Sequence, residues 1–420
     1  MILLKNATVV NHDGIKKYDV LIDGDIISKL GENLDALGAE TIDCEGKLLF
    51  PGFIDMHCHL REPGQTHKED IASGTAAAVS GGYTAVCCMP NTTPPIDNAA
   101  LVKYVRERSA ACGNAEAYPI GAITVGQGGK TLCEFGAMKA AGAVAVSDDG
   151  LPVGDGAVML NALRYAKTFD MLVISHSEDK SLSAGGVVNE GENATAAGLR
   201  GIPSAAESAA VARDVLLAEQ TGARIHIAHV STANSIDIIR AAKKRGVKVT
   251  CETCPHYFSA TDDEILSYNT NAKINPPLRS QSDVDAVIEG LADGTIDVIA
   301  TDHAPHGADE KNKEFDYAPF GTVGLETAFS LAYTELVRNE KIELTELCKL
   351  MSYNPAKILG LDGGVIRAGV RADITLVNPD DELTVDASLF RSKGKNSLFD
   401  GWRLMGRIEK VFVGGEEKII

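Results

Sequence analysis

The sequence has few aromatic residues and no excess of basic ones. Phe, Trp and Tyr make up 5% of the 420 residues, whereas glycine alone supplies 41. Scarce aromatics with plentiful Ala and Gly favour closely packed α/β layers over an aromatic-rich β-sandwich. The formal net charge is −18 at pH 7, whereas nucleic-acid binders usually carry a basic face. We therefore expect no nucleic-acid partner, and an anionic ligand would need a local cation or a placed arginine.

The chain also lacks a cysteine framework and a long apolar run. Its nine cysteines are odd in number, and most lie in apolar stretches, such as Cys87, Cys88 and Cys348. This usage is typical of buried thiols in a reducing cytoplasm. No run approaches the ~20 apolar residues of a membrane span, and residues 1–10 hold no apolar core of signal-peptide length. The sequence therefore predicts a cytoplasmic protein with no membrane partner.

Short apolar segments alternate with helical ones through the middle of the chain. This alternation indicates repeated βα units and a parallel sheet. We count eight such segments, and no G-x-G-x-x-G follows the first of them, which favours a closed barrel over an open doubly wound sheet. The segments are 52–57, 83–89, 117–123, 143–148, 171–176, 224–229, 248–253 and 296–302.

Both ends of the chain read instead as short strands joined by Asp-Gly, Glu-Gly and Gly-Gly corners. We therefore predict an α/β fold: a (β/α)₈ TIM-like barrel over 51–361, with a small β-sandwich domain built from 1–50 and 362–420. Two of the helices carry end signals. Ser204 with Glu207 predicts a capping box, and Gly222 and Gly246 predict helix ends.

Residues that bind metals recur at the ends of the predicted barrel strands. His57 and His59 are two apart on an extended segment, so both rings should lie on one face. Because the carboxyl ends of all barrel strands open onto one mouth, the strand-end residues should converge there. Imidazoles and carboxylates together suit a borderline-soft divalent cation. The predicted ligands are His57, His59, His176, His229, Asp302 and one aspartate of the pair Asp148 and Asp149.

Spacing alone does not decide which aspartate of that pair would bridge two cations, and the other would cap the following turn. Asp302 follows a strictly apolar strand and could both bind a cation and move protons. A cation lowers the pKa of a bound water to ~7, so a metal-bound hydroxide would be available at neutral pH. His226 lies three residues before His229, so on a regular strand it would point to the opposite face, and we interpret it as structural.

A carboxylate clamp is predicted beside these ligands. Arg61 lies two residues after His59 and would share its face in an extended chain, and its guanidinium suits a carboxylate. Asn91 and Asn275 each stand beside a proline after a strand, where a turn role is the alternative. The long charged loop 303–324, which contains His306, reads equally as a lid or as a solvated insertion.

In six sequence motifs the chain resembles the amidohydrolase superfamily and, within it, the bacterial type I dihydroorotases. Dihydropyrimidinase- and allantoinase-like members use a carboxylated lysine as the metal bridge, whereas the fourth strand here ends in Ser-Asp-Asp. The matching motifs are PGFIDMHCHLREPG (51–64), MPNTTPP (89–95), SDDG (147–150), SHSED (175–179), IAHVST (227–232) and ATDHAPHGADEK (300–311).

The resemblance implies a zinc hydrolase that reversibly opens the ring of L-dihydroorotate to N-carbamoyl-L-aspartate, the third step of de novo pyrimidine biosynthesis. It implies two Zn²⁺ per subunit, one held by His57, His59 and Asp302 and the other by His176 and His229, with Asp149 as the bridge. Asp302 would be the general acid/base. A homodimer and an association with aspartate transcarbamoylase are further expectations. The implied substrate contacts are His59, Arg61, Asn91, Asn275, His306, Phe320 and Gly321.

Two other functions stay open at this stage. The chain could be another cyclic amidase of the hydantoinase, dihydropyrimidinase or allantoinase type, whose substrates would leave a clamp of Arg61 and Asn91 unpaired. It could also be a metal-free scaffold for a partner enzyme. Such scaffolds have typically lost the His and Asp ligands, and here all six positions are filled.

Overall fold

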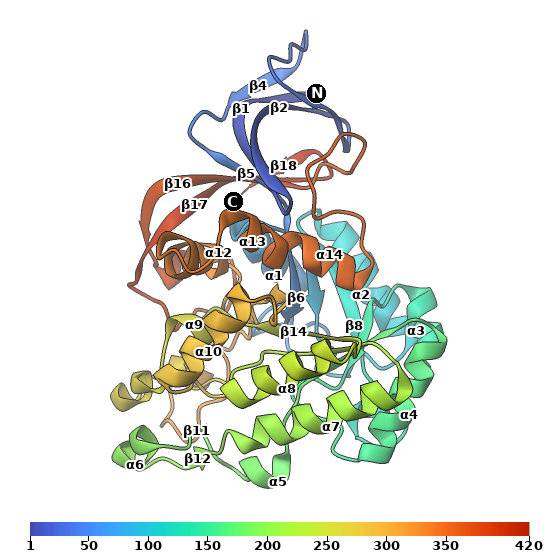
Figure 1. The fold of residues 1–420 in the computed structure, drawn as a ribbon, viewed down its shortest axis with the longest axis vertical. Coiled ribbons are helices and arrows are strands. Elements are labelled where there is room, and N and C mark those ends of the chain that lie inside the picture. Colours follow the sequence, from blue (N-terminus) through green and yellow to red (C-terminus); the bar gives the residue numbers. More distant parts are fainter. Residues whose placement is uncertain (420) are drawn as a thin grey trace.

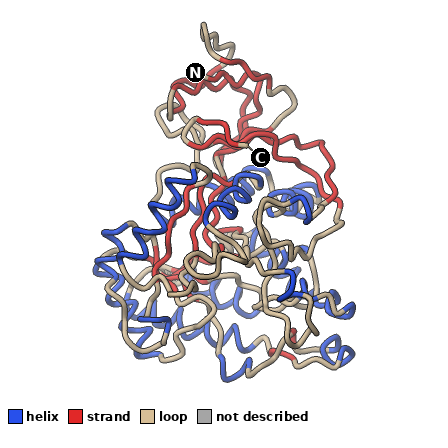
Figure 2. The backbone as a smooth tube through the Cα atoms, turned by 180° about the vertical axis from the view of Figure 1, so that it is seen from behind, coloured by secondary structure: helices blue, strands red, loops and turns tan. Residues whose placement is uncertain are grey.

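The computed structural model describes residues 1–419 of the chain. A β-rich part lies at one end of the molecule, and a larger part, in which helices surround a set of strands, lies beneath it (Figure 1). Seen from behind, the strands of the larger part run through its middle and the helices form its outer layer (Figure 2). None of the helices described is long and apolar enough to cross a membrane.

Eight parallel strands form the barrel, and each corresponds to one of the predicted apolar segments. They are hydrogen-bonded in chain order, and the two edge segments meet through a bridge between Cys58 and His303 and the 2.9 Å bond from His59 N to His303 O. The predicted fold class is therefore confirmed. The strands are β6 (Phe53–Cys58), β7 (Tyr83–Cys88), β8 (Glu116–Gly121), β9 (Ala145–Ser147), β10 (Leu172–Ser175), β13 (Ile225–Ile227), β14 (Val249–Thr253) and β15 (Val298–Ile299).

Helices connect successive barrel strands and cover the outside of the barrel (Figure 1). Between β10 and β13 the connection is longer and includes the small pair β11 (Val188–Asn189) and β12 (Gly201–Ile202). The helices are α1 (Ile71–Ser80), α2 (Ala99–Cys112), α3 (Phe135–Ala141), α4 (Gly156–Thr168), α5 (Lys180–Ser183), α6 (Glu192–Ala197), α7 (Ala205–Thr221), α8 (Ala233–Lys244), α9 (His256–Ser259), α10 (Gln281–Ala292), α11 (Ala308–Lys311), α12 (Ala328–Ala332), α13 (Leu344–Cys348) and α14 (Asn354–Leu359).

The β-rich part pairs the two ends of the chain, as the sequence predicts. The junction is the antiparallel pairing of β5 with β16, where Pro51 lies opposite Ile374. This part has its own apolar core, which includes Leu4, Ile22 and Phe412. Where the two domains divide along the chain stays a prediction. The strands are β1 (Ile2–Asn11), β2 (Gly14–Asp23), β3 (Ile26–Gly31), β4 (Glu40–Asp43), β5 (Leu48–Pro51), β16 (Ile374–Thr384), β17 (Arg403–Val413) and β18 (Glu416–Lys418).

Buried aromatic rings pack where the two parts meet. Phe53 on β6 stacks on Phe329 of α12 with ring centroids 5.0 Å apart. Phe50 of β5 lies 5.7 Å from Phe53 and 5.6 Å from Phe329, and all three are fully buried. These three rings thus fill the junction between the two parts with large buried side chains.

The predicted helix ends are confirmed, but the predicted capping box is wrong. α7 stops at Gly222 with φ 63°, and Gly246 with φ 83° follows the end of α8. Ser204 has helical backbone angles and makes no capping hydrogen bond. The Glu207 carboxylate instead accepts from the backbone N–H groups of Ser231 and Thr232, each at 3.1 Å. Glu207 therefore binds the buried loop at Ser231 and Thr232 and does not cap its own helix.

A segment of the C-terminal region reaches back from the β-rich part to the barrel. We call residues 390–398 the C-terminal brace. Asn396 accepts a 3.0 Å bond from His306 N through its side-chain oxygen, and its amide donates to the carbonyls of Ala304 and Gly321, both at 3.1 Å. The loop 303–324 is thus tied to the C-terminal region as well as to the barrel.

Candidate metal centre

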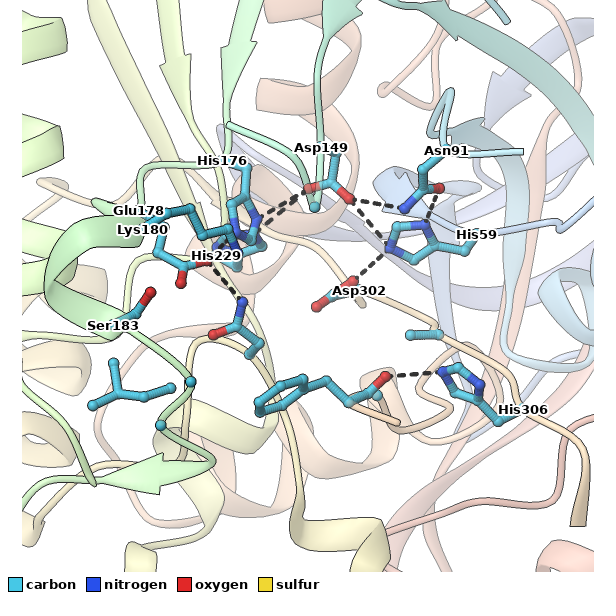
Figure 3. A pocket seen from close by; sticks show the side chains of 18 of the residues that line it. His59, Asn91, Asp149, His176, Glu178, Lys180, Ser183, His229, Asp302 and His306 are labelled. Carbon is cyan, nitrogen blue, oxygen red and sulfur yellow. Dashed lines mark hydrogen bonds and ion pairs between the residues drawn. The ribbon is translucent and has the colours of Figure 1, made fainter. Parts of the chain in front are cut away.

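The carboxyl ends of the barrel strands open into a cavity of about 380 Å³. In a barrel all strands end on the same face, so residues far apart in the chain can meet there. Every predicted site residue lines this cavity except His57, which is fully buried beneath it. The lining ones are His59, Arg61, Asn91, Asp149, His176, His229, Asn275, Asp302, His306, Phe320 and Gly321, and several are labelled in Figure 3.

The backbone at the strand ends directs these side chains inward. His229 has φ 35° and Asp302 has φ 45°, and each follows shortly after its barrel strand has ended. Residues other than glycine rarely adopt such angles, which cost of order 1–3 kcal/mol and cluster at functional sites. Arg61, with φ 57°, is a third case. The chain there is therefore not extended as predicted, although the Arg61 side chain still reaches the cavity.

One group of ligand atoms lies around Asp302. Its Oδ1 is 3.0 Å from His59 Nε2 and 3.5 Å from His57 Nε2. These three residues offer ligand atoms within 4.8 Å of one another, and all three are buried. The structure thus brings His57, His59 and Asp302 together, as the sequence predicts.

A second group lies around Asp149, as Figure 3 shows. Its Oδ1 is 3.3 Å from His176 Nδ1, 3.4 Å from His57 Nε2 and 3.7 Å from His229 Nε2. Asp149 therefore lies between the two groups, where a bridging ligand would be. Asp148 points away, and its carboxylate accepts from the backbone N–H groups of Ile123 and Thr124 rather than capping the following turn.

Two buried atoms at the centre of this cluster have no hydrogen-bond partner among the described residues. They are His57 Nε2 and Asp149 Oδ1, which face each other across 3.4 Å. Buried polar atoms are nearly always paired, so an orphaned pair needs an explanation. Imidazole nitrogen and carboxylate oxygen are ligands of Zn²⁺ and related divalent cations. The donor set therefore fits such a cation.

The remote nitrogens of three imidazoles are held by side-chain oxygens. His57 Nδ1 lies 2.6 Å from Glu252, His59 Nδ1 lies 2.8 Å from Asn91, and His176 Nε2 lies 3.1 Å from Glu178. An oxygen at the remote nitrogen retains the proton there, which leaves the other nitrogen free to bind a metal. This pattern is characteristic of metal-binding histidines.

The electrostatics of the cluster also call for positive charge. Burial lowers the pKa of His57, but the carboxylates of Asp149 and Asp302 outweigh it and raise that pKa well above its usual value. Burial raises the pKa of Asp302, but the charge of His57 and the hydrogen bond from His59 hold it well below its usual range. The carboxylates therefore stay ionised and require a counter-charge, which a divalent cation would supply in place of protons.

Another part of the cavity lining is basic because it holds Arg61, and we call the lining around Arg61 and His306 the basic wall. Arg61 is 8% exposed, and its Nε donates to Pro305 O at 3.2 Å while Nη2 lies 3.5 Å from His306 Nε2. Burial and the charge of Arg61 lower the pKa of His306 to about 3, so His306 is neutral at pH 7. A substrate carboxylate on this side would meet a guanidinium that no carboxylate of residues 1–419 pairs within hydrogen-bonding distance.

Asn91 and Asn275 make contacts within the site that the sequence did not predict. Asn91 bonds to His59 and lies 3.5 Å from Asp149, and Asn275 donates to Glu178 at 3.0 Å. Both amides line the cavity, but each already serves a residue of the metal cluster or its support. They are therefore placed to orient the cluster as well as to contact a ligand.

Sequence reasoning missed Glu178 and Glu252. Glu178 lies in the same SHSED motif as His176, and Glu252 is a charged residue inside the buried strand β14. Such a charge in a buried strand was the available signal, because an ionised side chain there needs a partner. Besides His57, Glu252 contacts His226, whose Nε2 lies 3.1 Å away. His226 neither lines the cavity nor joins a group of ligand atoms, and its Nδ1 contacts Thr250 at 2.8 Å, which agrees with its structural interpretation.

We expect Glu252→Gln to weaken metal binding by about 10–100-fold, as removal of an outer partner of a metal ligand typically does. The glutamine oxygen can still accept from His57, but the negative charge that makes the imidazole a better ligand is lost. Chelator competition on the metal-loaded protein measures the affinity. Glu219→Gln, at a surface ion pair with Arg245, is the matched control. An unchanged affinity in Glu252→Gln would remove Glu252 from the support of the site.

The chain is similar to known dihydroorotases over almost its whole length. A family model described as dihydro-orotase-like matches residues 46–235. A dihydroorotase from Acetivibrio thermocellus is 52% identical over 417 residues, covering 98% of this chain and 97% of that protein. A dihydroorotase from Pelotomaculum thermopropionicum is 53% identical over 419 residues, covering 99% and 97% respectively.

Solved structures with a similar fold include two cyclic-amide hydrolases. A dihydropyrimidinase from Brevibacillus agri superposes with a TM-score of 0.87 at 25% identity, covering 99% of this chain and 94% of that one. An L-hydantoinase from Arthrobacter aurescens superposes with a TM-score of 0.89 at 26% identity, covering 99% and 95%. The whole architecture, with both the barrel and the β-rich part, is thus shared.

Proposed function

Because this chain belongs to the dihydroorotase family, we propose that it catalyses the reversible hydrolytic ring opening of L-dihydroorotate to N-carbamoyl-L-aspartate. The enzyme is a hydrolytic cyclic amidase, and the proposed reaction is the third step of de novo pyrimidine biosynthesis. One observation carries the proposal at the level of residues. Histidines and aspartates converge at the cavity, and two of their buried atoms, His57 Nε2 and Asp149 Oδ1, have no hydrogen-bond partner among the described residues. The basic wall with Arg61 lines the same cavity.

The proposed ligands follow the two groups of atoms in the cluster. His57, His59 and Asp302 would hold one Zn²⁺, His176 and His229 the other, and Asp149 would lie between them. When bound, such a cation supplies Lewis acidity and lowers the pKa of a coordinated water to ~7. The identity of the metal and the number of two per subunit rest on the family resemblance and on this donor set.

Asp302 is the proposed general acid/base. Hydrolysis forms a C–O bond at the ring carbonyl and breaks its C–N bond, so a proton must pass from water to the leaving nitrogen. Asp302 is ionised, borders the cavity and lies 3.0 Å from His59 Nε2, so its carboxylate can accept that proton and return it. In ring closure the same carboxylate would act in the reverse order.

The basic wall sets the proposed orientation of the substrate. Arg61 would bind the carboxylate of dihydroorotate, with Asn91, Asn275 and His306 as neutral polar contacts around the ring. His59 and the pair Phe320 and Gly321 complete the proposed contacts. The scissile amide would then face Asp149 and Asp302 on the other side of the cavity.

A hydantoinase-type activity is the second candidate, since the similar solved structures come from enzymes of that type. Those structures are 25–26% identical, whereas the dihydroorotase relatives reach 52–53%. A buried arginine that is not paired with a carboxylate of the described chain also favours a substrate that brings its own. A homodimer, an association with aspartate transcarbamoylase and a cytoplasmic location remain predictions.

The direct test is ring opening by the zinc-loaded protein, followed by ultraviolet absorbance with L-dihydroorotate and with 5,6-dihydrouracil. These substrates share the ring and differ in the carboxylate. We expect turnover of L-dihydroorotate and production of N-carbamoyl-L-aspartate, with little turnover of dihydrouracil. Preferential opening of dihydrouracil or hydantoin would replace the proposed function with the second candidate.

Arg61→Met is expected to raise the KM for L-dihydroorotate by about 10-fold or more, because a hydrogen bond to a charged group contributes roughly 1.5–3 kcal/mol. Methionine keeps much of the apolar stem and removes the guanidinium. The kcat should change less than the KM, since the Arg61 guanidinium contacts Pro305 and His306 rather than Asp302 or another proposed metal ligand. Steady-state kinetics in both directions measure the effect. An unchanged KM would take Arg61 out of the carboxylate clamp.

A further inference from the structure

Two lysine side chains are buried behind the basic wall of the cavity. Lys273 is 2% exposed and Lys311 is 6% exposed. Lys273 Nζ donates to the carbonyls of Phe315 and Asp316 at 2.8 and 2.9 Å. Lys311 Nζ donates to the carbonyls of Pro319 and Gly321, both at 2.9 Å. Both ammonium groups thus bind the loop whose residues Phe320 and Gly321 line the cavity.

No carboxylate balances the charge of Lys311 in the part of the chain that the structure describes. Burial is the main influence on its pKa and lowers it to about 7, with a further contribution from the charge of Lys273. Buried charges are normally paired, because their transfer out of water is costly. About half of the Lys311 side chains are therefore protonated at pH 7, and an anion in the cavity would provide the missing counter-charge and favour the protonated form.

The two carbonyls that Lys311 binds flank Phe320, so the ammonium lies one residue behind the cavity surface. Lys273 lies 4.9 Å from the centroid of the same Phe320 ring. His306 bonds to Phe320 O at 2.9 Å, and Lys311 is among the charges that lower the pKa of His306. The lysines therefore stand on the same side of the cavity as Arg61.

A purely structural role would not require a charge at this position. The neutral amide of Asn396 already donates to Gly321 O, and an amide at position 311 could donate to the same carbonyls. The whole chain carries a net charge of −18, so an anionic ligand depends on local positive groups. Lys311 is such a group, because it is buried behind the basic wall and no carboxylate of the described residues pairs with it.

We propose that Lys311 is a specificity-determining positioning residue, whose buried charge, set behind Gly321, favours ligands that carry carboxylates. The inference rests on the proposed function and extends it to a residue that does not itself touch the substrate. N-carbamoyl-L-aspartate carries two carboxylates and L-dihydroorotate carries one, so the charge of Lys311 acts more strongly on the open-chain ligand.

The test compares Lys311→Gln, which keeps a hydrogen-bond donor and removes the charge, with Lys311→Met, which removes both. Lys313→Gln is the matched control, because Lys313 is exposed and lies two residues away in the same loop. All variants are assayed as zinc-loaded, full-length protein. In Lys311→Gln we expect the KM for N-carbamoyl-L-aspartate to rise about tenfold, and more than the KM for L-dihydroorotate, by loss of a nearby charge. Lys313→Gln should match the parent.

A second readout separates charge from shape. The inhibition constant of 5,6-dihydrouracil, which lacks the carboxylate, should stay unchanged in Lys311→Gln, and kcat should stay within about threefold of the parent. An unchanged KM for N-carbamoyl-L-aspartate would overturn the inference, as would an equal weakening of dihydrouracil. If Lys311→Met does not fold, Lys311→Gln decides alone. The parent enzyme tests the proposed function separately, because its turnover of L-dihydroorotate does not depend on the variants.

Discussion

Asp302→Asn is expected to lower kcat in both directions by about 10²–10⁴-fold, the usual contribution of a positioned general acid/base. Asparagine keeps the size of the side chain and one oxygen, so it can still occupy the position beside His59 Nε2. It cannot accept and return a proton as the carboxylate does. The KM should change much less than kcat, because Arg61 and the basic wall are unaffected.

Metal content must be measured with this variant, because Asp302 is also a proposed ligand. The asparagine side chain still offers one oxygen to a cation, so we expect most of the metal to be retained under saturating zinc. Asp148→Asn is the matched control, because Asp148 is another aspartate at a strand end and its carboxylate binds the Ile123 and Thr124 N–H groups instead of lining the cavity. Its kcat should be close to that of the parent. If Asp302→Asn keeps both metal and full kcat, another group must move the proton.

His57→Ala is expected to abolish measurable turnover while the fold is retained. His57 belongs to both groups of ligand atoms, so its loss affects both at once. We expect metal affinity to fall by more than the roughly 100-fold that an outer partner contributes. Metal analysis after dialysis and the ring-opening assay measure the loss, and circular dichroism reports the fold.

His67→Ala is the control for this variant, since His67 is exposed in the loop that follows the same strand. In His57→Ala the fully buried Glu252 is left with His226 as its imidazole partner, so stability should fall somewhat. His57→Asn, with a polar group at the same place, provides a second variant if the alanine variant is unstable. Full activity of His57→Ala after chelation would falsify the metal-dependent mechanism.

The barrel could be predicted from sequence because its strands are buried on both faces. Segments such as 83–89 and 171–176 are largely apolar runs, which distinguish parallel buried strands from the alternating strands at the chain ends. The candidate ligands could be located from sequence because each follows such a run, and a closed barrel brings all strand ends to one face. Their convergence on Asp149 and Asp302 followed from topology rather than from local conformation.

Local geometry was predicted less well, and for a common reason. Arg61 and His229 were placed by the alternation of an extended chain, but both have positive φ after their strands have ended. Glu207 was assigned to a capping box, but a distant loop binds its carboxylate instead. In each case the tertiary structure outweighs the local preference, and its contacts cannot be derived from neighbouring residues.

The supporting residues were the least predictable part of the site. Glu252 lies 195 residues from His57, and Asn396 lies 90 residues from His306. Neither belongs to a motif that contains a ligand. Their roles depend on which strands and segments become neighbours, and this follows only once the barrel is closed and the C-terminal brace is in place.

The C-terminal brace has a consequence for the order in which the enzyme matures during synthesis. Domains generally fold from the N-terminal end as the chain leaves the ribosome. Every barrel strand has been translated by residue 299, yet Asn396, which ties Ala304, His306 and Gly321 together, is translated much later. A chain that ended before Asn396 would therefore contain every barrel strand but lack a residue that orders its substrate-binding loop.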